Sequence, residues 1–273
     1  MTRALPFGEL HAFPDGNRPH SGNPAAVVLL DAPLDDAMLA GLARSNNLSE
    51  TAFLLAGGEA DLWGLRWFTP GHEVDLCGHA TLASAVWLFG EGHVKGKTAR
   101  FDTLSGRLEV SRTGDDLFVM DFPAVAWRPA ARAPGIAEAM GAGAPLEMHD
   151  LDRIHGNRYM MLVYESEAAV AGLKPDLRVL EEAGINVLAT ARGSSADIVS
   201  RFFCPAAGIS EDPVTGSAHC TLAPYWAERL GKPRLTARQI GPRPGALEVE
   251  ARENGRVALY GTARPFIAGQ IFV

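Results

Sequence analysis

The chain has 273 residues, of which 47% are hydrophobic and 21% charged, a composition typical of a soluble globular protein of about two domains. A net charge of −7 without a basic run argues against nucleic acid, and no apolar run reaches the ~20 residues of a membrane helix. Three cysteines make no disulfide framework and the N-terminus lacks the apolar segment of a signal peptide, so we expect a cytoplasmic protein with reduced thiols.

The first 122 residues read mainly as strands. Hydrophobic runs and period-two alternation predict strands at 4–13, 25–30, 51–55, 62–68, 101–103, 107–112 and 117–121. Helical spacing predicts a helix over 35–44. A second helix, over 78–89, is apolar on every side and is therefore expected to be buried at the centre of an N-terminal domain, with Gly90 ending it.

The start of this central helix is a candidate binding site. It opens on Cys77, Gly78 and His79, where backbone N–H groups have no partner within the helix. The positive end of the helix dipole adds to these donors, so such a start attracts an anion such as a carboxylate. Gly78 lets a ligand approach the backbone closely.

The second half of the chain repeats the first. Segment 66–70 matches 201–205, 79–83 matches 219–223, and 106–110 matches 245–249, at offsets of 135 to 140 residues. A period this long indicates a duplicated domain rather than a solenoid. We therefore predict a C-terminal domain over 123–273. Its last strand either belongs to the sheet of that domain or packs back on the N-terminal domain. Its central helix is expected at 216–230, and the two central helices are expected to line one ligand-binding cleft.

The remaining elements of the second half follow the same order. Strands are expected at 159–164, 187–190, 197–203, 246–251, 256–260 and 267–273, and short helices at 135–140 and 177–183. Pro224 interrupts the pattern of the second central helix, where it either kinks the helix or begins another segment.

Glu50 is the first candidate catalytic residue. It stands between the apolar residues Leu48 and Phe53. A lone glutamate in such a loop is usually exposed or caps a helix. The alternative is a partly buried carboxylate whose pKa is raised enough to move a proton near neutrality.

His79 and Asp212 stand at or just before the two helix starts. The dipole there disfavours imidazolium, so His79 is expected to be neutral and able to relay a proton, unless it is simply a capping or core histidine. Asp212 reads either as an N-terminal cap or as a site carboxylate. Thr215, Gly216 and Ser217 either cap the second helix or donate hydrogen bonds to a substrate oxygen.

Cys77 has two interpretations as well. A helix start lowers a thiol pKa, which suits a two-base racemase, but the second half has no thiol at the equivalent place, which favours an inert buried cysteine. His72, Cys77 and His79 match no common zinc spacing, so no metal is expected. Glycine-rich nucleotide motifs are absent, so no cofactor is expected either.

Five motifs in order carry a family resemblance. They are 22–25 (GNPA), 47–53 (NLSETAF), 68–70 (FTP), 74–81 (VDLCGHAT) and 211–219 (EDPVTGSAH). Together they resemble the PhzF-like isomerase family of phenazine biosynthesis over nearly the whole chain. The resemblance implies an α/β (α+β) fold like that of diaminopimelate epimerase, with two similar domains, each a curved mixed sheet or barrel around a central helix.

The resemblance also implies an activity. It suggests cofactor-independent proton transfer on a small carboxylate-bearing substrate by a homodimer, with Glu50 as acid and base and with His79, Asp212 and Ser217 in the site. An amino-acid epimerase or racemase using Cys77 is the nearest alternative, and a non-catalytic protein that binds small acids is another. The substrate itself is not implied.

Overall fold

The computed structural model describes residues 3–130, 133–152 and 158–273, which form two compact units. Unit 1 comprises Met1–Asp121 and Tyr260–Val273, and unit 2 comprises Phe122–Leu259. The sequence-based division lay within one residue of the first boundary and left the last strand open between the two domains. In the structure that strand, β18 (Ala263–Phe272), pairs with β1 (Ala4–Ala12) of unit 1.

Unit 1 is a mixed sheet with two helices. Its further elements are β2 (Asn23–Leu30), α1 (Asp36–Asn46), β3 (Glu50–Ala56), β4 (Leu62–Phe68), β5 (Glu73–Val74), α2 (Gly78–Gly90), β6 (Thr98–Thr103), β7 (Gly106–Arg112) and β8 (Phe118–Pro123). The strands pair in the order β18, β1, β2, β3, β4, β6, β7 and β8. The pairs β2–β3 and β4–β6 are parallel and the others are antiparallel.

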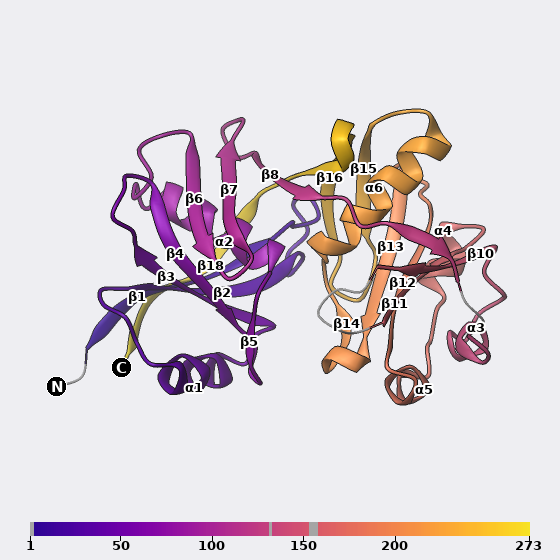
Figure 1. Cartoon of the computed structure of the whole chain (residues 1–273), viewed down its shortest axis with the longest axis horizontal. Coiled ribbons are helices and arrows are strands. Elements are labelled where there is room, and N and C mark those ends of the chain that lie inside the picture. Colours follow the sequence, from indigo (N-terminus) through magenta and orange to yellow (C-terminus); the bar gives the residue numbers. More distant parts are fainter. Residues whose placement is uncertain (1–2, 131–132, 153–157) are drawn as a thin grey trace. The chain divides into compact units, whose positions relative to one another are not determined.

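Helix α2 is the centre of unit 1, because nearly all of its side chains are apolar and buried. It contacts β1, β2, β3, β7 and β18, and Figure 1 shows it enclosed by these strands. It ends one residue later than predicted, at Gly90. The left-handed conformation expected of Gly90 belongs instead to Gly92, whose φ is +70°.

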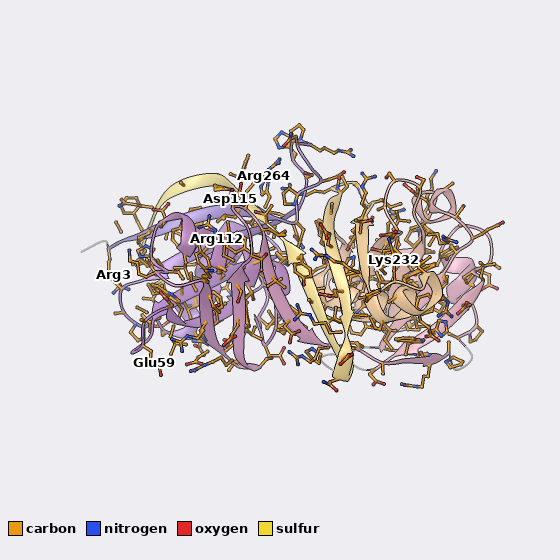
Figure 2. The ribbon with its side chains drawn as sticks, turned by 90° about the horizontal axis from the view of Figure 1, so that it is seen from above. Arg3, Glu59, Arg112, Asp115, Lys232 and Arg264 are labelled. Carbon is orange, nitrogen blue, oxygen red and sulfur yellow. The ribbon has the colours of Figure 1, made fainter. Side chains whose placement is uncertain are left out.

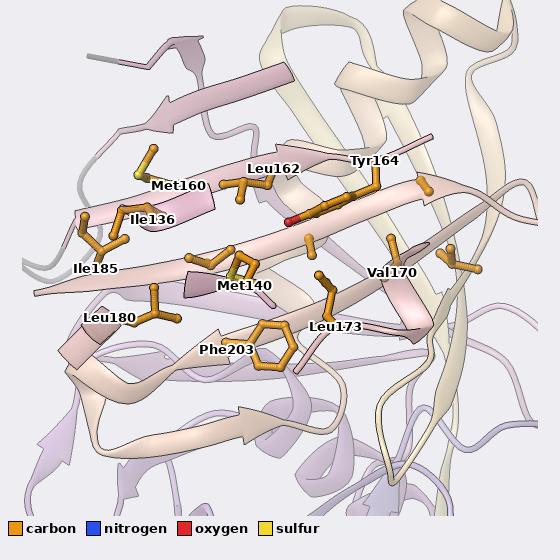
Figure 3. Close-up of a cluster of buried hydrophobic side chains, with 14 residues drawn as sticks. Ile136, Met140, Met160, Leu162, Tyr164, Val170, Leu173, Leu180, Ile185 and Phe203 are labelled. Atoms are coloured by element: carbon orange, nitrogen blue, oxygen red, sulfur yellow. The ribbon is translucent and has the colours of Figure 1, made fainter. Parts of the chain in front are cut away.

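Unit 2 has the same plan. Its elements are β9 (Trp127–Pro129), α3 (Ile136–Ala139), β10 (Glu147–Leu151), β11 (Arg158–Val163), α4 (Glu167–Ala171), α5 (Leu177–Glu182), β12 (Ile185–Arg192), β13 (Ile198–Cys204), β14 (Ile209–Asp212), α6 (Gly216–Leu230), β15 (Arg234–Gln239), β16 (Gly245–Arg252) and β17 (Arg256–Gly261). The pairs β11–β12 and β13–β15 are parallel, like β2–β3 and β4–β6 in unit 1. A buried apolar cluster that includes Met140, Leu162 and Phe203 packs α3, α4 and α5 on the sheet (Figure 3).

A pair of matching ion pairs confirms the duplication. In unit 1, Arg66 of β4 donates two hydrogen bonds to Glu73 of β5, at 2.6 and 2.7 Å. In unit 2, Arg201 of β13 donates two to Glu211 of β14, at 2.7 and 2.8 Å. Each guanidinium also lies over the phenylalanine two residues further along its strand. One local geometry has therefore been kept in both copies.

Pro224 lies inside α6 without ending it. Proline has no N–H, so the carbonyl of Cys220 one turn earlier loses its helical partner. The N–H of Val125 donates to that carbonyl instead, at 3.1 Å. Of the two alternatives for Pro224, the one in which it begins another segment is therefore wrong, because the connection between β8 and β9 satisfies the freed carbonyl.

Polar side chains cover the outside of both units. Charged residues such as Glu59, Arg112 and Lys232 project outward from strands, turns and helix ends (Figure 2). In the described part of the chain, no helix is at once long enough and apolar enough to cross a membrane.

Candidate active site

Glu50 is the first residue of β3, which follows α1 after a short turn. Asn47 caps α1 in the left-handed conformation, with φ of 52°, and reverses the chain toward the sheet. Glu50 then pairs in the parallel register with Ala25, which is fully buried and small. Its side chain is 13% exposed. The carboxylate is therefore partly buried, as one of the two interpretations of the sequence requires.

His79 lies against Glu50. It is the second residue of α2 and its side chain is 7% exposed. Its Nε2 atom is 3.2 Å from Oε2 of Glu50, the distance of an ion pair. The two atoms are not aligned for a hydrogen bond, and neither has another hydrogen-bond partner within the described residues. Both groups therefore keep a hydrogen-bonding position open.

Cys77 completes the cluster in unit 1. It is the N-cap residue of α2, and its side chain makes no capping hydrogen bond to the helix. Its Sγ atom is 3.5 Å from Nδ1 of His79. The hydroxyl of Thr81 donates to the carbonyl of Cys77 at 2.6 Å, which fixes the turn. Cys77 and Glu50 thus flank the same imidazole.

The electrostatics of this cluster bear on both His79 and Cys77. Burial lowers the pKa of His79, but the contacts of the imidazole with Cys77 and Glu50 outweigh burial and raise that pKa well above its usual value. Burial, reinforced by Glu50, raises the pKa of the Cys77 thiol. The thiol therefore stays protonated near neutrality, so Glu50 is the charge that acts on His79. These directions do not support the interpretation of a neutral His79, and of the two interpretations of Cys77 they favour the inert buried cysteine.

Asp212 lies in a second cluster, in unit 2. It ends β14 and is 9% exposed. The hydroxyl of Thr215, the N-cap residue of α6, donates a short hydrogen bond to Oδ2 of Asp212. Asp212 is therefore hydrogen-bonded to the N-cap residue of α6.

Gln239 organises this second cluster. It ends β15 and is fully buried. Its Oε1 accepts the backbone N–H of Thr215 at 2.9 Å, and its Nε2 donates to the carbonyl of Asp212 at 2.5 Å. Reading the sequence missed both β15 and Gln239. The signal was present, because Leu235, Ala237 and Gln239 alternate on the buried face.

Both central helices begin at glycine, Gly78 in α2 and Gly216 in α6, and neither has a side-chain cap. The interpretation in which the Thr215 side chain caps α6 is therefore wrong. Ser217, the second residue of α6, is half-buried. It occupies the place in α6 that His79 occupies in α2.

Two residues that the sequence singled out lie apart from this chemistry. His72 is exposed in the turn after β4, and its carbonyl accepts the N–H of Thr69 at 2.9 Å. His219 matches His79 in the repeated letters but is the fourth residue of its helix, not the second. Its Nδ1 lies 2.8 Å from the carbonyl of Thr215, and burial lowers its pKa to about 4.

A partly buried carboxylate beside an imidazole at a helix start is an arrangement that can move a proton. The profile described as phenazine biosynthesis-like protein matches residues 10–269. A protein of Pseudomonas aeruginosa named an uncharacterized isomerase is 46% identical over 270 residues, covering 98% of each chain. This chain therefore belongs to the phenazine biosynthesis-like (PhzF-like) family.

Solved structures agree with the assignment. A PhzF-family protein of Enterococcus faecalis is 38% identical, with a TM-score of 0.90 over 99% of this chain and 100% of that one. A probable proline racemase of Agrobacterium radiobacter is 13% identical, with a TM-score of 0.69 over 98% of this chain and 92% of that one, which shows the fold alone. The predicted fold class and family are confirmed.

Proposed function

We propose that the protein is a cofactor-independent isomerase that moves a proton on a small carboxylate-bearing substrate, with Glu50 as both acid and base. The observation that carries the proposal is the position of Glu50, partly buried and 3.2 Å from His79. Oε2 of Glu50 has no hydrogen-bond partner within the described residues, so a substrate C–H or O–H can occupy that position.

His79 supports this role electrostatically. The raised pKa of His79 favours an imidazolium, which lies 3.2 Å from the carboxylate of Glu50. When Glu50 has taken the substrate proton, its negative charge is lost and the positive charge on His79 faces the substrate. An anion that develops on the substrate is then stabilised by a neighbouring cation. This assigns His79 a role as charge stabiliser rather than as a neutral relay.

Gly78, Thr215, Gly216 and Ser217 are proposed to bind the substrate, and Asp212 to take part in catalysis, as the family resemblance implies. The uncapped starts of α2 and α6 support the choice of a carboxylate, because each offers free N–H donors and roughly half a positive charge. Glycine at the first position of each helix leaves these donors accessible.

Deuterium exchange tests the proposal. A panel of small unsaturated carboxylic acids is incubated with the enzyme in deuterated water, and label at carbon is followed by NMR. Label should enter at least one acid with the native enzyme and fail to enter with Glu50→Gln. Equal labelling by Glu50→Gln would remove Glu50 from the mechanism. If neutral amides bind as tightly as the matching acids, the substrate does not need a carboxylate and that part of the proposal is wrong.

A cysteine-type epimerase is the second candidate, because Sγ of Cys77 contacts His79. The raised pKa of that thiol weighs against it, as does the presence of Thr215 at the corresponding N-cap position of α6. Inactivation by thiol alkylation would favour the epimerase. A protein that binds acids without labelling any of them would be the non-catalytic binder.

A cytoplasmic homodimer is also proposed, following the family resemblance. Strand β18 offers an apolar surface for such contact, since Phe266, Ile267 and Phe272 are 54%, 44% and 65% exposed. Light scattering at micromolar concentration should give the mass of two chains. The mass of a single chain would contradict the dimer.

A further inference from the structure

The cluster in unit 1 contains three kinds of metal-binding atom. A carboxylate oxygen of Glu50, the sulfur of Cys77 and a ring nitrogen of His79 all lie within 4.8 Å of one another. The sequence does not suggest this set, because Glu50 is separated from the other two by a whole hairpin. The donor that completes the group is therefore Glu50 and not His72.

The spacing suits a tetrahedral ion. Zinc binds imidazole nitrogen and carboxylate oxygen at about 2.0–2.2 Å, which separates two such ligands by about 3.4 Å. His79 Nε2 and Glu50 Oε2 are 3.2 Å apart. Cys77 Sγ is 3.5 Å from Nδ1, the other ring nitrogen, so an ion held by Nε2 and Glu50 takes the sulfur as a third ligand only after the Cys77 side chain changes its rotamer.

The site is also buried, and two of its polar atoms lack hydrogen-bond partners within the described residues. His79 and Cys77 are 6% and 7% exposed. Nε2 of His79 and Oε2 of Glu50 have no hydrogen-bond partner within the described residues, although both are buried. Polar atoms of this kind usually have a partner, and an ion between them would satisfy both.

We propose that Glu50, Cys77 and His79 form a binding site for zinc or a similar transition metal, with one coordination position left open. The nitrogen, sulfur and oxygen donors favour such a metal over magnesium or calcium, which take oxygen ligands. If Glu50 acts as proposed above, a bound metal withdraws its carboxylate and so inhibits turnover. Binding itself does not depend on that proposal.

Cobalt gives a direct test, because thiolate-bound Co²⁺ has a charge-transfer band that water-bound Co²⁺ lacks. The native protein, purified with chelator and then freed of it, is titrated with Co²⁺ and followed by absorbance. Zn²⁺ binding is measured in parallel by calorimetry. We expect a saturable band at one equivalent, displaced by Zn²⁺.

Variants assign the ligands. Cys77→Ser should abolish the cobalt band, and Glu50→Gln and His79→Gln should each weaken Zn²⁺ binding more than about tenfold, since changes outside the first ligands already cost that much. Cys220→Ser and His72→Ala are the matched controls, because Cys220 is also a buried free thiol and His72 an exposed histidine five residues before Cys77. Both should bind as the native protein does.

The outcomes separate this proposal from the enzymatic one. Absence of a saturable band in the native protein, or a band that survives Cys77→Ser, overturns the site. Binding that His72→Ala or Cys220→Ser removes overturns it as well. No substrate is present in these titrations, so a saturable band that Cys77→Ser abolishes supports the site whether or not any acid is labelled.

Discussion

The central helices of the two units begin in the same way but carry different side chains at their first positions. In unit 1 the N-cap of α2 is Cys77 and the second helical residue is His79. In unit 2 these places hold Thr215 and Ser217. One copy therefore carries an ionisable thiol and imidazole, and the other carries hydroxyl groups that donate and accept hydrogen bonds.

The counterpart of Glu50 sharpens the contrast. Arg66 pairs with Phe53 across β3 and β4, and Arg201 pairs with Ala189 across β12 and β13. Glu50 lies three residues before Phe53, and Asn186 lies three residues before Ala189. Asn186 is therefore the residue of unit 2 that is equivalent to Glu50. Asn186 is fully buried, and its Oδ1 accepts the N–H of Ala206 at 3.1 Å. A carboxylate in one copy is therefore a buried amide in the other.

This difference shows how a duplicated scaffold acquires an acid–base group. The sheet, the central helix and the arginine–glutamate pair are kept, and chemistry changes at three or so positions around the helix start. Unit 1 is suited to proton transfer, while Asp212, Thr215 and Gln239 hold unit 2 in a fixed hydrogen-bonded arrangement.

The largest effect is expected from Glu50→Gln, which makes unit 1 resemble unit 2 at this position. Turnover should fall by about 10²–10⁴-fold, the usual contribution of a general acid–base group, while the fold is kept. Deuterium labelling measures the turnover, and circular dichroism measures whether the fold is kept. Glu59→Gln is the control, because Glu59 is an exposed glutamate in the turn after β3. Native rates in Glu50→Gln would contradict the asymmetry.

The arginine–glutamate pairs should differ in stability contribution. The Arg201 side chain is 10% exposed and its NH1 also donates to the carbonyl of Leu173 at 2.8 Å, whereas Arg66 is 37% exposed. Arg201→Met should therefore cost about 3–5 kcal/mol of unfolding free energy, as for a broken buried pair. Arg66→Met should cost about 1 kcal/mol or less. Denaturant unfolding compares them, and equal losses would contradict the prediction.

The two buried histidines should give opposite pH dependence. Folded His219 binds a proton only below about pH 4, whereas unfolded histidine does so below about 6.5, so its contribution is lost as the pH falls through that window. The shift corresponds to about 3 kcal/mol. The pKa of His79 is raised, so its contribution is complete below about pH 6.5 and is lost as the pH rises through the folded value.

Thermal unfolding from pH 4 to 9 measures both effects. His219→Gln should reduce the loss of stability on the acid side, and His79→Gln should reduce the loss on the alkaline side. His20→Gln is the control, since His20 is exposed. The same pH profile in both buried-histidine variants would show that their environments do not differ as described.

Much of this organisation could be predicted from the sequence. Both central helices, the duplication and the motif around Glu50 are visible as local patterns. The β5, β14 and β15 strands were not predicted, because the first two are very short and the alternation in Arg234–Gln239 covers only six residues, half of them polar or charged on the outer face. The position of Gln239 against Thr215 depends on β-sheet register, which no local pattern contains.

The charge state of His79 could not be predicted for a different reason. From the sequence only the helix dipole is known, and it amounts to about half a positive charge at the helix start. The structure adds a full negative charge on Glu50 at 3.2 Å, which outweighs the dipole. Glu50 precedes His79 by a strand hairpin, so their contact is a tertiary feature that residue spacing does not reveal.

The smallest effect is expected from Cys77→Ala. The thiol is buried, its pKa is raised, and the corresponding N-cap residue of α6 is a threonine, so proton transfer by Glu50 does not require it. Labelling rates should stay within about threefold of native, against the much larger loss for a true acid–base group. Cys220→Ala, which removes a buried thiol from α6, is the control for packing. If Cys77→Ala instead loses as much activity as Glu50→Gln, and the native enzyme is inactivated by alkylation, then unit 1 carries a thiol base and the epimerase mechanism replaces the one proposed.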